Sequence, residues 1–434
     1  MPYDSGMGIA AISRRSFLAS STALTAKSTR PNLLFILVDS WRGQALPAED
    51  SNLIAPNLRR LASEGVNCGS AYTSYPVCCP SRAAMLTGRF PHAAGVRHNH
   101  SLLPMRQETM SQAMKKAGYR TGYIGKWHLD GGENPGFVAP ERRRGFDYWA
   151  AYNVIHQHFD TPYFGDSPAL IPTKGFEADH QTNLAIDFIR RKSKQPFYLY
   201  LSYVPPHSPY TPPKEHATYD TSELKLRANV PRESQAKARK DLAGYYGLCS
   251  AVDEDIGKIL KELDSRGLTE NTIVVFTSDH GTMLESHGMD AIDVPFEEAT
   301  RIPLLIRYPR RIRAGSVMDL PVSNVDYAPT LMSFCGVKAL PHAQGTNLSG
   351  VLTESKGPRP SSIYSYGSLD QADEWRMVST SYHKLVVDAA RKPKYLFDLV
   401  KDPFELRNLV NEDSRRLDEM TGLLDGWEKR SGPL

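Results

Sequence analysis

Residues 33–38 read Leu-Leu-Phe-Ile-Leu-Val, and Asp39 follows them directly. An uninterrupted apolar run of this length indicates a strand that is buried on both faces. Such strands form parallel sheets covered by helices, and the ligands of these sheets lie beyond the carboxyl ends of the strands. Asp39 is therefore predicted to lie at the ligand-binding edge of a sheet.

A second buried strand is predicted far along the chain. Residues 272–277 (TIVVFT) and one serine precede Asp279 and His280. Because the carboxyl ends of parallel strands meet at one edge, we expect Asp39 to lie beside these two residues. The alternative interpretation of each aspartate taken alone is that it caps the helix or turn that follows its strand. Together, the two carboxylates and the imidazole suit Ca²⁺ or Mg²⁺ better than zinc, which recruits more nitrogen or sulfur.

Helical and extended patterns alternate along most of the chain. This order predicts an α/β fold with a central, mostly parallel sheet. Residues 130–180 have no periodicity and are rich in Gly, Pro, His and aromatic residues, which favours a functional loop that walls a pocket. Helices are predicted over residues 55–64, 109–117, 181–192, 235–266 and 325–336, and further strands over 121–125, 197–203 and 303–308.

The pattern changes near residue 338 to short stretches of alternating polarity. This change predicts a small C-terminal subdomain with an antiparallel sheet and a closing helix. We therefore divide the chain into a large α/β domain over 31–337 and a C-terminal subdomain over 338–434. The predicted strands of the subdomain are 362–366, 376–388 and 395–399, and its helix is 414–429.

Residues 1–30 are predicted to be an export signal. Arg14 and Arg15 precede a short, weakly apolar stretch that ends near Ala26, and this pattern resembles a Tat signal. A disordered basic tail is the alternative interpretation. No other stretch reaches the roughly 18 apolar residues that a membrane span needs. We therefore expect a periplasmic or secreted chain without a stable membrane anchor.

The formal net charge is +4 over 434 residues, without a block of Lys or Arg. This balance argues against a nucleic-acid partner and favours a local cationic pocket for a small anion. The five cysteines are too few and too scattered for a disulfide framework or a zinc site. Cys249 and Cys335 lie in apolar segments and are predicted to be core residues.

Two adjacent cysteines open a short predicted helix. Residues 78–82 read Cys-Cys-Pro-Ser-Arg, and the helix is predicted over 80–87 with Pro80 in its first position. The free N–H groups at a helix N-terminus favour an anion or a thiolate, and Arg82 adds a positive charge. A buried cysteine pair beside a helix cap is the alternative interpretation.

Three further polar residues lie at predicted strand ends. Lys126 and His128 follow one strand, and His207 follows another. Together with Arg82, these side chains would form a cage for an oxyanion. Each histidine taken alone is more often a structural residue, so the prediction depends on the group.

These motifs, in this order, resemble the formylglycine-dependent sulfatase family of the alkaline phosphatase superfamily. Residues 78–82 match its signature Cys-x-Pro-Ser-Arg, and residues 85–89 (MLTGR) continue it. The resemblance extends over about residues 31–412. It is also carried by residues 31–39, 125–128 (GKWH), 206–209 (PHSP), 277–281 (TSDHG), 395–399 (YLFDL) and 401–403 (KDP).

The resemblance implies that a formylglycine-generating enzyme oxidises Cys78 to formylglycine (3-oxoalanine), with Cys79 in the variable position. The hydrate of this aldehyde has two hydroxyl groups; one attacks sulfur, and collapse of the other expels the sulfate. The resemblance also implies a divalent metal, Ca²⁺ or alternatively Mg²⁺. Its ligands would be Asp39, modified Cys78, Asp279 and His280.

The same resemblance implies roles for the cationic side chains. Arg82 would stabilise the modified cysteine, and Lys126 and His207 would hold the sulfate oxygens. His128 would contact the hydrate or assist its collapse. His207 or a neighbour would protonate the leaving alcohol. Electrostatic contacts of this kind are typically worth a few kcal/mol each in the transition state.

Two positions depart from the family pattern. Ser40 stands where many sulfatases have a second aspartate, and Ile292 stands where a lysine is expected, five residues after His287. A serine hydroxyl can still bind a metal weakly or through water. An apolar side chain can neither bind a sulfate oxygen nor protonate a leaving group. Either another cation substitutes for the lysine, or the activity is reduced or redirected.

The predicted function is hydrolysis of sulfate esters by an exported, metal-dependent enzyme with an alkaline-phosphatase-like fold. The predicted substrate is a sulfated small molecule or saccharide, because the side chains of residues 130–180 suit a sugar-sized ligand. One alternative is a phosphonate or phosphate ester hydrolase of the same superfamily. Another is a weakly active protein that binds sulfated glycans, which Ser40 and Ile292 would favour.

Overall fold

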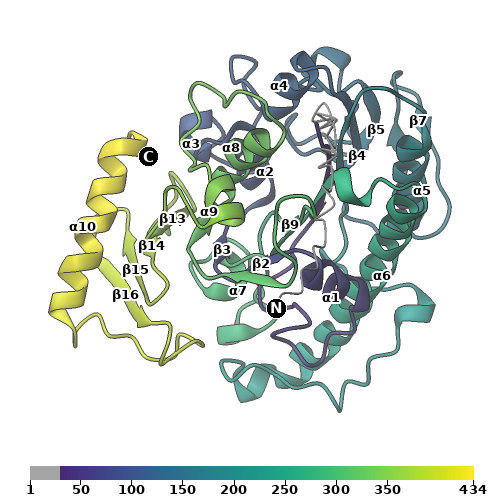
Figure 1. The fold of residues 1–434 in the computed structure, drawn as a ribbon. Coiled ribbons are helices and arrows are strands. Elements are labelled where there is room, and N and C mark those ends of the chain that lie inside the picture. The colour runs from purple at the N-terminus through teal and green to yellow at the C-terminus, as the bar shows by residue number, and fades with distance from the viewer. Residues whose placement is uncertain (1–29) are drawn as a thin grey trace, which may run out of the picture.

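The computed structural model describes residues 30–434. The predicted Tat-type signal, with Arg14 and Arg15, lies outside the described residues. Within residues 30–434, no helix has the length and apolar character that crossing a membrane requires. Figure 1 shows a large α/β body that carries a smaller unit at the C-terminal end of the chain.

A ten-stranded mixed sheet forms the centre of the large body, as the sequence predicts. Neighbouring strands from β9 through β1, β8 and β4 to β5 are parallel, whereas β10, β6 and β7 run antiparallel to their partners. In spatial order the strands are β11 (Ser316–Met318), β2 (Val66–Cys68), β10 (Leu304–Arg307), β9 (Thr272–Ser278), β1 (Asn32–Val38), β8 (Phe197–Ser202), β4 (Arg120–Lys126), β5 (Tyr148–Tyr152), β6 (Tyr163–Phe164) and β7 (Leu170–Ile171).

The register of the two central strands sets the position of the site. Every residue of β1 and β9 is buried, as expected for strands covered on both faces. Val38 pairs with Ser278 at the end of the parallel ladder. Asp39 and Asp279 therefore follow their strands at the same level, and the Asp279 N–H donates to the Val38 carbonyl oxygen at 3.2 Å.

Helices cover both faces of the sheet, and the side chains of β1 alternate between the two cores. Leu33 and Phe35 pack with residues of α2, α4 and α8, whereas Leu34 and Ile36 pack with residues of α1, α5 and α6. One layer contains α2 (Cys78–Thr87), α4 (Met110–Lys116) and α8 (Tyr327–Phe334), and the other contains α1 (Pro56–Ser63), α5 (Glu177–Arg190) and α6 (Gln235–Ser265).

Shorter elements connect these layers. They are α3 (Pro91–Ala94), α7 (Glu297–Thr300), α9 (Ser349–Glu354) and a two-stranded sheet of β3 (Ala71–Tyr72) and β12 (Val322–Ser323).

The C-terminal unit is a separate antiparallel sheet covered by one helix, as predicted, but it has four strands because residues 376–388 form two strands joined by a turn rather than one. Leu385 and Leu396 of the sheet pack against Leu424 and Trp427 of the helix. In Figure 1 this unit is yellow and lies beside the large body. Its elements are β13 (Ile363–Gly367), β14 (Trp375–Ser379), β15 (His383–Asp388), β16 (Pro393–Asp398) and α10 (Ser414–Ser431).

The structure corrects two further predictions of local structure. Helix α2 begins at Cys78 rather than at Pro80, so both cysteines lie in its first turn. A proline is tolerated there because the first N–H groups of a helix have no acceptor within the helix. Residues 130–180 are not irregular throughout, because they contain β5, which joins the central sheet. The sequence did not predict this strand, because its two alanines have low strand propensity.

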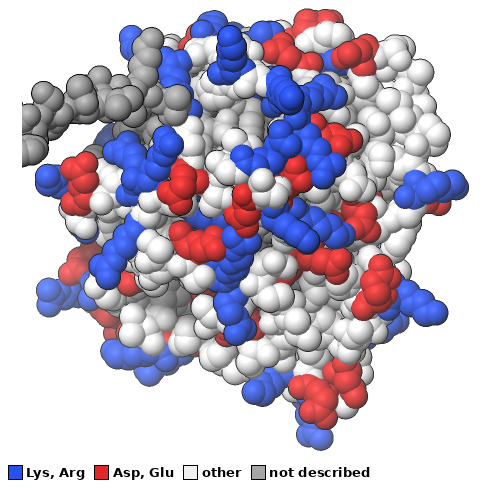
Figure 2. All heavy atoms as spheres, turned by 45° about the vertical axis from the view of Figure 1, so that its right-hand side comes forward, with Lys and Arg blue, Asp and Glu red and all other residues white. Residues whose placement is uncertain are grey.

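Two further views show one face of the surface and one cavity of the core. On the face shown in Figure 2, basic and acidic side chains lie side by side, which agrees with the small net charge of +4.

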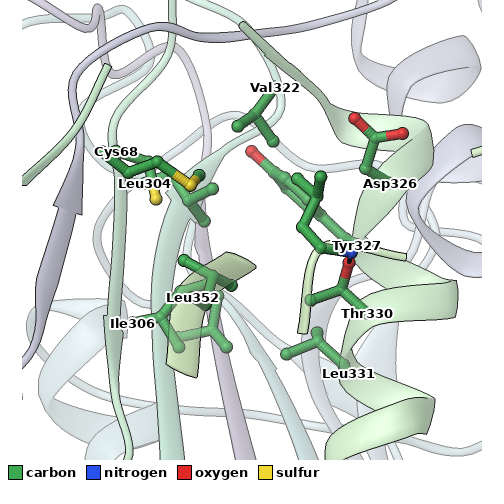
Figure 3. A pocket seen from close by; sticks show the side chains of 12 residues that line it. Cys68, Leu304, Ile306, Val322, Asp326, Tyr327, Thr330, Leu331 and Leu352 are labelled. Atoms are coloured by element: carbon green, nitrogen blue, oxygen red, sulfur yellow. Dashed lines mark hydrogen bonds between the residues drawn. The ribbon is translucent and has the colours of Figure 1, made fainter. Parts of the chain in front are cut away.

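Figure 3 shows an almost wholly apolar cavity between β9, β10 and α8. The carboxylate of Asp326 at its border accepts the N–H groups of Ser323 and Thr346. None of the predicted site residues lines this cavity, so we interpret it as imperfect packing of the core.

Candidate active site

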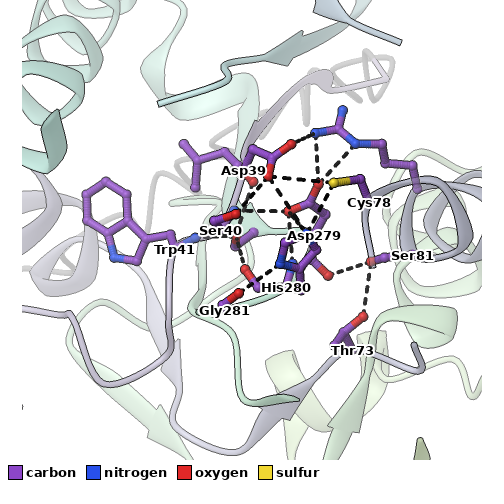
Figure 4. Close-up of polar contacts among 12 residues, drawn as sticks. Asp39, Ser40, Trp41, Thr73, Cys78, Ser81, Asp279, His280 and Gly281 are labelled. Carbon is purple, nitrogen blue, oxygen red and sulfur yellow. Dashed lines mark hydrogen bonds and ion pairs between the residues drawn. The ribbon is translucent and has the colours of Figure 1, made fainter. Parts of the chain in front are cut away.

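The ends of β1 and β9 bring four potential ligands together beside helix α2 (Figure 4). One donor atom from each of four buried residues lies within 4.8 Å of every other. The sequence predicted two carboxylates and one imidazole together at two strand ends, and the family resemblance implied the cysteine as the fourth ligand. The four residues, here called the Asp39 cluster, are Asp39, Cys78, Asp279 and His280.

Only the first of the adjacent cysteines faces the cluster. The sulfur of Cys78 lies 3.3 Å from His280 Nε2 and 3.6 Å from Lys126 Nζ. The thiol of Cys79 instead donates to the carbonyl oxygen of Ser101 at 3.3 Å. Burial raises the pKa of Cys79 to about 12, so this thiol stays protonated at neutral pH. Of the two cysteines, Cys78 therefore has the thiol that lies against the cluster.

Arg82 holds the two strand ends together. Its guanidinium donates to Asp39 Oδ2 at 3.1 Å and to Asp279 Oδ2 at 3.0 Å. The remaining donor group Nη1 binds the carbonyl oxygen of Lys126 and the hydroxyl of Ser202. Such a fixed fork of donors positions planar carboxylates well. Arg82 is therefore an organiser of the cluster with no donor group left over for a substrate.

The remaining residues of the cysteine motif also have a structural explanation. The hydroxyl of Ser81 donates to the main-chain oxygen of Asp279 at 2.6 Å. The same hydroxyl accepts from Thr73 and from the side-chain amide of Asn324. The serine that follows the proline thus attaches α2 to the end of β9.

Opposite charges dominate the electrostatics of the cluster. Burial alone would raise the pKa of Asp39, but Lys126, His207 and Arg82 outweigh it and hold this pKa well below its usual range. Burial likewise opposes the charge on Lys126, but Asp39 raises the pKa of its ammonium group. At neutral pH the cluster therefore contains an ionised carboxylate beside a charged ammonium group.

The donor set fits a divalent cation. Arg82 and Lys126 bind Oδ2 atoms of the aspartates, whereas both Oδ1 atoms lie 3.7 and 3.8 Å from His280 Nε2. His280 Nδ1 lies 2.8 Å from the carbonyl oxygen of Gly281 and donates to it, so in the neutral ring the lone pair is on Nε2. A ring held this way by the main chain is the usual arrangement of a metal-binding histidine. Two carboxylate oxygens and one imidazole nitrogen thus face a common point next to Cys78.

Ser40 takes part in the cluster in place of a second aspartate. Its hydroxyl donates to Asp39 Oδ1 at 2.9 Å, and its N–H donates to Asp279 Oδ1 at 3.2 Å. Its backbone has a positive φ of 68°, which is unusual for a residue with a side chain. Ser40 therefore orients the two carboxylates through hydrogen bonds from its hydroxyl and its N–H.

Lys126 reaches the cluster from the end of β4. The glycine before it, Gly125, has a φ of 98°, and a Cβ atom there would lie only 2.1 Å from the carbonyl oxygen of Ser202. Close packing of β4 on β8 therefore requires glycine at this position. The Lys126 ammonium group lies 2.8 Å from Asp39 Oδ2 and 3.0 Å from His156 Nε2.

The predicted histidines lie around the cluster, but with partners that the sequence did not reveal. His207 stacks on His156, with ring centroids 4.3 Å apart and an angle of 8° between the rings. His128 Nε2 lies 2.9 Å from His100 Nδ1, and its own Nδ1 has no hydrogen-bond partner among residues 30–434. Burial and Lys126 hold the pKa of His128 below its usual range. The structure shows no hydrogen bond between His128 and Cys78 among these residues.

A second group of ligating side chains, two of them buried, lies where the large body meets the C-terminal unit. Donor atoms of His287, Glu298 and Glu405 lie within 4.8 Å of one another. Lys384 Nζ lies 2.7 Å from Oε1 of both Glu297 and Glu405. Glu298 Oε1 accepts from Arg227 Nε and from the amide group of Asn229. We call this set the Glu405 network; it consists of His287, Glu297, Glu298, Lys384 and Glu405. Cations of the protein already neutralise its carboxylates.

Taken together, the fold and the site define a class: an α/β protein with a cluster of potential metal ligands at the sheet edge and a buried cysteine in the first turn of a helix. Comparison with known proteins gives the family. Residues 31–337 match the family described as Sulfatase, and residues 287–424 match N-sulphoglucosamine sulphohydrolase, C-terminal. The chain therefore belongs to the sulfatase family of sulfuric ester hydrolases, in the alkaline phosphatase superfamily.

Individual relatives agree with this assignment. An ulvan-active sulfatase of Formosa agariphila is 34% identical over 88% of this chain and 78% of its own length. An N-acetylglucosamine-6-O-sulfatase of Bacteroides thetaiotaomicron is 29% identical over 93% of this chain and 87% of its own. A solved structure of a protein in complex with its substrate D-glucosamine-2-N,6-O-disulfate is 27% identical, with a TM-score of 0.82, over 93% of this chain and 98% of that one.

Proposed function

We propose that this protein removes sulfate groups from carbohydrate sulfate esters. The observation that carries the proposal is the Asp39 cluster, in which Cys78 lies between potential metal ligands and the ammonium group of Lys126. The names of the relatives support the substrate class, because they include an ulvan-active sulfatase and an N-acetylglucosamine-6-O-sulfatase. A sugar sulfate is therefore the substrate that we expect.

The nucleophile in this proposal comes from Cys78 after oxidation to formylglycine. When hydrated, that group supplies one hydroxyl for attack on sulfur and a second whose collapse releases the sulfate. The position of Cys78 supports this role, because its sulfur lies within 4 Å of His280, Lys126 and Asp39. Arg82 fixes the carboxylates beside it and so holds the charges of the site in place.

Asp39, Asp279 and His280 would hold Ca²⁺, with Mg²⁺ as the alternative. A divalent ion supplies positive charge that favours a deprotonated nucleophile and stabilises negative charge on the sulfate oxygens. Oxygen ligands from carboxylates suit both ions. Lys126 adds a second positive charge beside Cys78 and would bind a sulfate oxygen. His207 and His128 would handle protons of the leaving alcohol and of the nucleophile.

Export in the folded state completes the proposal. Arg14 and Arg15 support a Tat route, because two arginines before a short apolar stretch are typical of Tat signals. Proteins on that route fold before they cross the membrane. A formylglycine-generating enzyme would then act on Cys78 in the cytoplasm before export. Fractionation of cells that express the full chain, with Arg14 and Arg15 replaced by lysine as the matched control, tests this step. Retention of the control in the cytoplasm is the expected result, and equal export of both chains would contradict it.

The substrate proposal is tested by incubating the matured enzyme with a panel of compounds. The panel contains sulfated monosaccharides, ulvan, an aryl sulfate and an aryl phosphonate ester, and the product measured is released sulfate or phenol. We expect release of sulfate from a sugar sulfate and none by Cys78→Ala. Preferential turnover of the phosphonate ester would favour a phosphonate hydrolase. Glycan binding that survives Cys78→Ala, without any sulfate release by the wild type, would favour a binding protein.

A further inference from the structure

We propose that His158, held by Glu177, positions His207 for the reaction at the Asp39 cluster. This inference rests on the proposed sulfatase function, in which His207 contacts the sulfate group or the leaving alcohol. His158 and Glu177 lie outside the motifs that identify the family. Both side chains are buried, at 2% exposure each, so their contacts are fixed by the fold.

His207 lies in a segment that few main-chain hydrogen bonds can hold. Three of the five residues 205–209 are prolines, which have no N–H to donate. The His207 N–H donates to the carbonyl oxygen of Val204 at 3.0 Å. Its ring Nδ1 lies 2.5 Å from the carbonyl oxygen of Ser208 and donates to it. Both acceptors are close neighbours in the chain, so neither contact attaches the segment to another part of the fold.

His158 supplies such an attachment. Its Nε2 lies 2.7 Å from the carbonyl oxygen of His207. A carbonyl oxygen only accepts, so this Nε2 carries a hydrogen and donates it. His156, two residues earlier, stacks on the His207 ring and lies 3.0 Å from Lys126 Nζ, which places the ring beside the Asp39 cluster. Residues 156–158 thus contact both the ring and the main chain of His207.

Glu177 fixes the orientation of the His158 ring. It is the first residue of α5, where the helix N-terminus favours a negative charge. Its Oε2 accepts from the Tyr152 hydroxyl at 2.8 Å and from the Gln181 amide at 3.4 Å. Its Oε1 lies 3.7 Å from His158 Nδ1. Within residues 30–434, neither of these two facing atoms has a hydrogen-bond partner.

The two facing atoms complement each other through one proton. A carboxylate oxygen and an unprotonated ring nitrogen both only accept, and two buried acceptors without a donor cost free energy. A hydrogen on either atom makes a donor and an acceptor of them. In the described part of the chain, His158 is the only basic residue in an ion pair with Glu177. The Glu177 N–H also donates to the His158 carbonyl oxygen at 2.8 Å, so Glu177 holds both the ring and the main chain of His158.

NMR of protein labelled with ¹⁵N-histidine tests the positioning without depending on turnover. The ring Nδ1–H of His207 should give a slowly exchanging signal because the Ser208 carbonyl protects it, and His207→Ala assigns this signal by its loss. His158→Phe keeps a ring but removes the donor, so it should shift or broaden the signal. His158→Gln, whose amide nitrogen can donate to the same carbonyl, should retain it. The matched control His216→Phe, which breaks a different histidine–glutamate pair with Glu254, should leave it unchanged.

Kinetics tests the consequence for the reaction. His158→Phe should lower kcat/KM for a sulfate ester by about 10- to 100-fold, as expected when a group near the reacting atoms is misplaced. His158→Gln should recover most of this loss, and Glu177→Gln should lose about three- to tenfold. In a His207→Ala background, His158→Phe should change kcat/KM by less than about threefold, because the residue that it positions is gone. A purely structural role would give the same loss in both backgrounds.

Urea unfolding confirms that each variant is folded, and Glu177→Gln carries the test if His158→Phe does not fold. An unchanged His207 signal, or equal losses of kcat/KM in the two backgrounds, would overturn the proposal. If the signal shifts but the wild type hydrolyses no sulfate ester, the proposed function fails and the attachment of His207 by His158 stands. If the wild type hydrolyses sulfate esters and folded His158→Phe is equally active, this inference alone fails.

Discussion

The Asp39 cluster and the Glu405 network contain similar residues in different electrostatic settings. Both combine carboxylates with one histidine, and all of these ligating residues are buried except His287, which is partly exposed. In the Asp39 cluster the cations bind the Oδ2 atoms, so Oδ1 of Asp39 and of Asp279 still face His280. In the Glu405 network Lys384 lies between two carboxylates. The comparison shows that closeness of ligating atoms alone does not define a metal site. What matters is which carboxylate oxygens the protein's own lysine and arginine side chains already bind, because only the other oxygens can bind a metal ion.

The largest expected effect separates two neighbouring cysteines at the first site. Cys78→Ala should lower kcat/KM for a sulfate ester by about 10⁴-fold or more, because it removes the precursor of the nucleophile. Cys79→Ala should leave kcat/KM within about threefold of the wild type, since its thiol only fills space and binds Ser101. Steady-state kinetics on both variants measures the contrast. A similar loss in both would show that the helix N-terminus as a whole, rather than Cys78, is required.

Metal removal compares the two regions directly. Chelation should reduce activity by at least about 100-fold, and added Ca²⁺ or Mg²⁺ should restore it, because a bound ion contributes several kcal/mol of charge stabilisation. Metal analysis of the purified protein should find a single ion per chain. Asp279→Asn should lose this ion, and Glu405→Gln should keep it. Equal loss of metal in both variants would contradict the distinction between the two regions.

Breaking the Glu405 network should affect stability rather than chemistry. Lys384→Met leaves Glu297 and Glu405 without their buried cation, which typically costs about 3–5 kcal/mol of the free energy of unfolding. Lys401→Met, which removes an exposed ion pair with Asp398, should cost less than about 1 kcal/mol. Urea unfolding measures both values. A Lys384→Met protein with unchanged stability but abolished turnover would place the network in the catalytic machinery.

A smaller effect concerns the pH dependence of stability. Burial, opposed by Lys384, raises the pKa of Glu405 from 4.5 to about 7 in the folded chain. Between these values the unfolded chain releases a proton that the folded chain keeps, so the free energy of unfolding should fall as the pH rises from about 5 to 7. The contribution of Glu405 to this fall is roughly 2 kcal/mol.

The variant Glu405→Gln isolates that contribution. Its unfolding free energy should decrease less over the same pH range than that of the wild type. Asp255 and Asp326, whose pKa values burial also raises to about 7, retain part of the slope in both proteins. Urea unfolding at a series of pH values measures the difference. Identical slopes for wild type and variant would show that Glu405 titrates alike in the folded and unfolded chains.

The sequence reveals the Asp39 cluster well because local patterns specify it. Buried strands are recognisable in the sequence as apolar runs. A polar residue directly after such a run lies at the edge of the sheet where ligands bind. Asp39 and Asp279 are found this way. The motif around Cys78 adds the third component, since the proline and arginine have defined places at a helix start. The central sheet and the C-terminal sheet follow from the same periodicities.

The remaining features depend on contacts between distant segments. His156 lies in a stretch without periodicity, and only the folded chain places it against Lys126. The Glu405 network joins segments that are far apart in the chain, and no local pattern pairs Lys384 with Glu297. Strand β5 is short and contains two alanines, so its place in the sheet comes from tertiary packing rather than propensity. A histidine among many polar neighbours gives no signal of its own.

The central claim is that Cys78 of the Asp39 cluster acts after oxidation to formylglycine. The most direct measurement is the mass of the peptide that contains Cys78, isolated from enzyme of known specific activity. We predict that its side chain has the mass of an aldehyde in place of a thiol, and that specific activity rises in proportion to the converted fraction. Fully active enzyme with an unmodified Cys78 thiol would contradict this account.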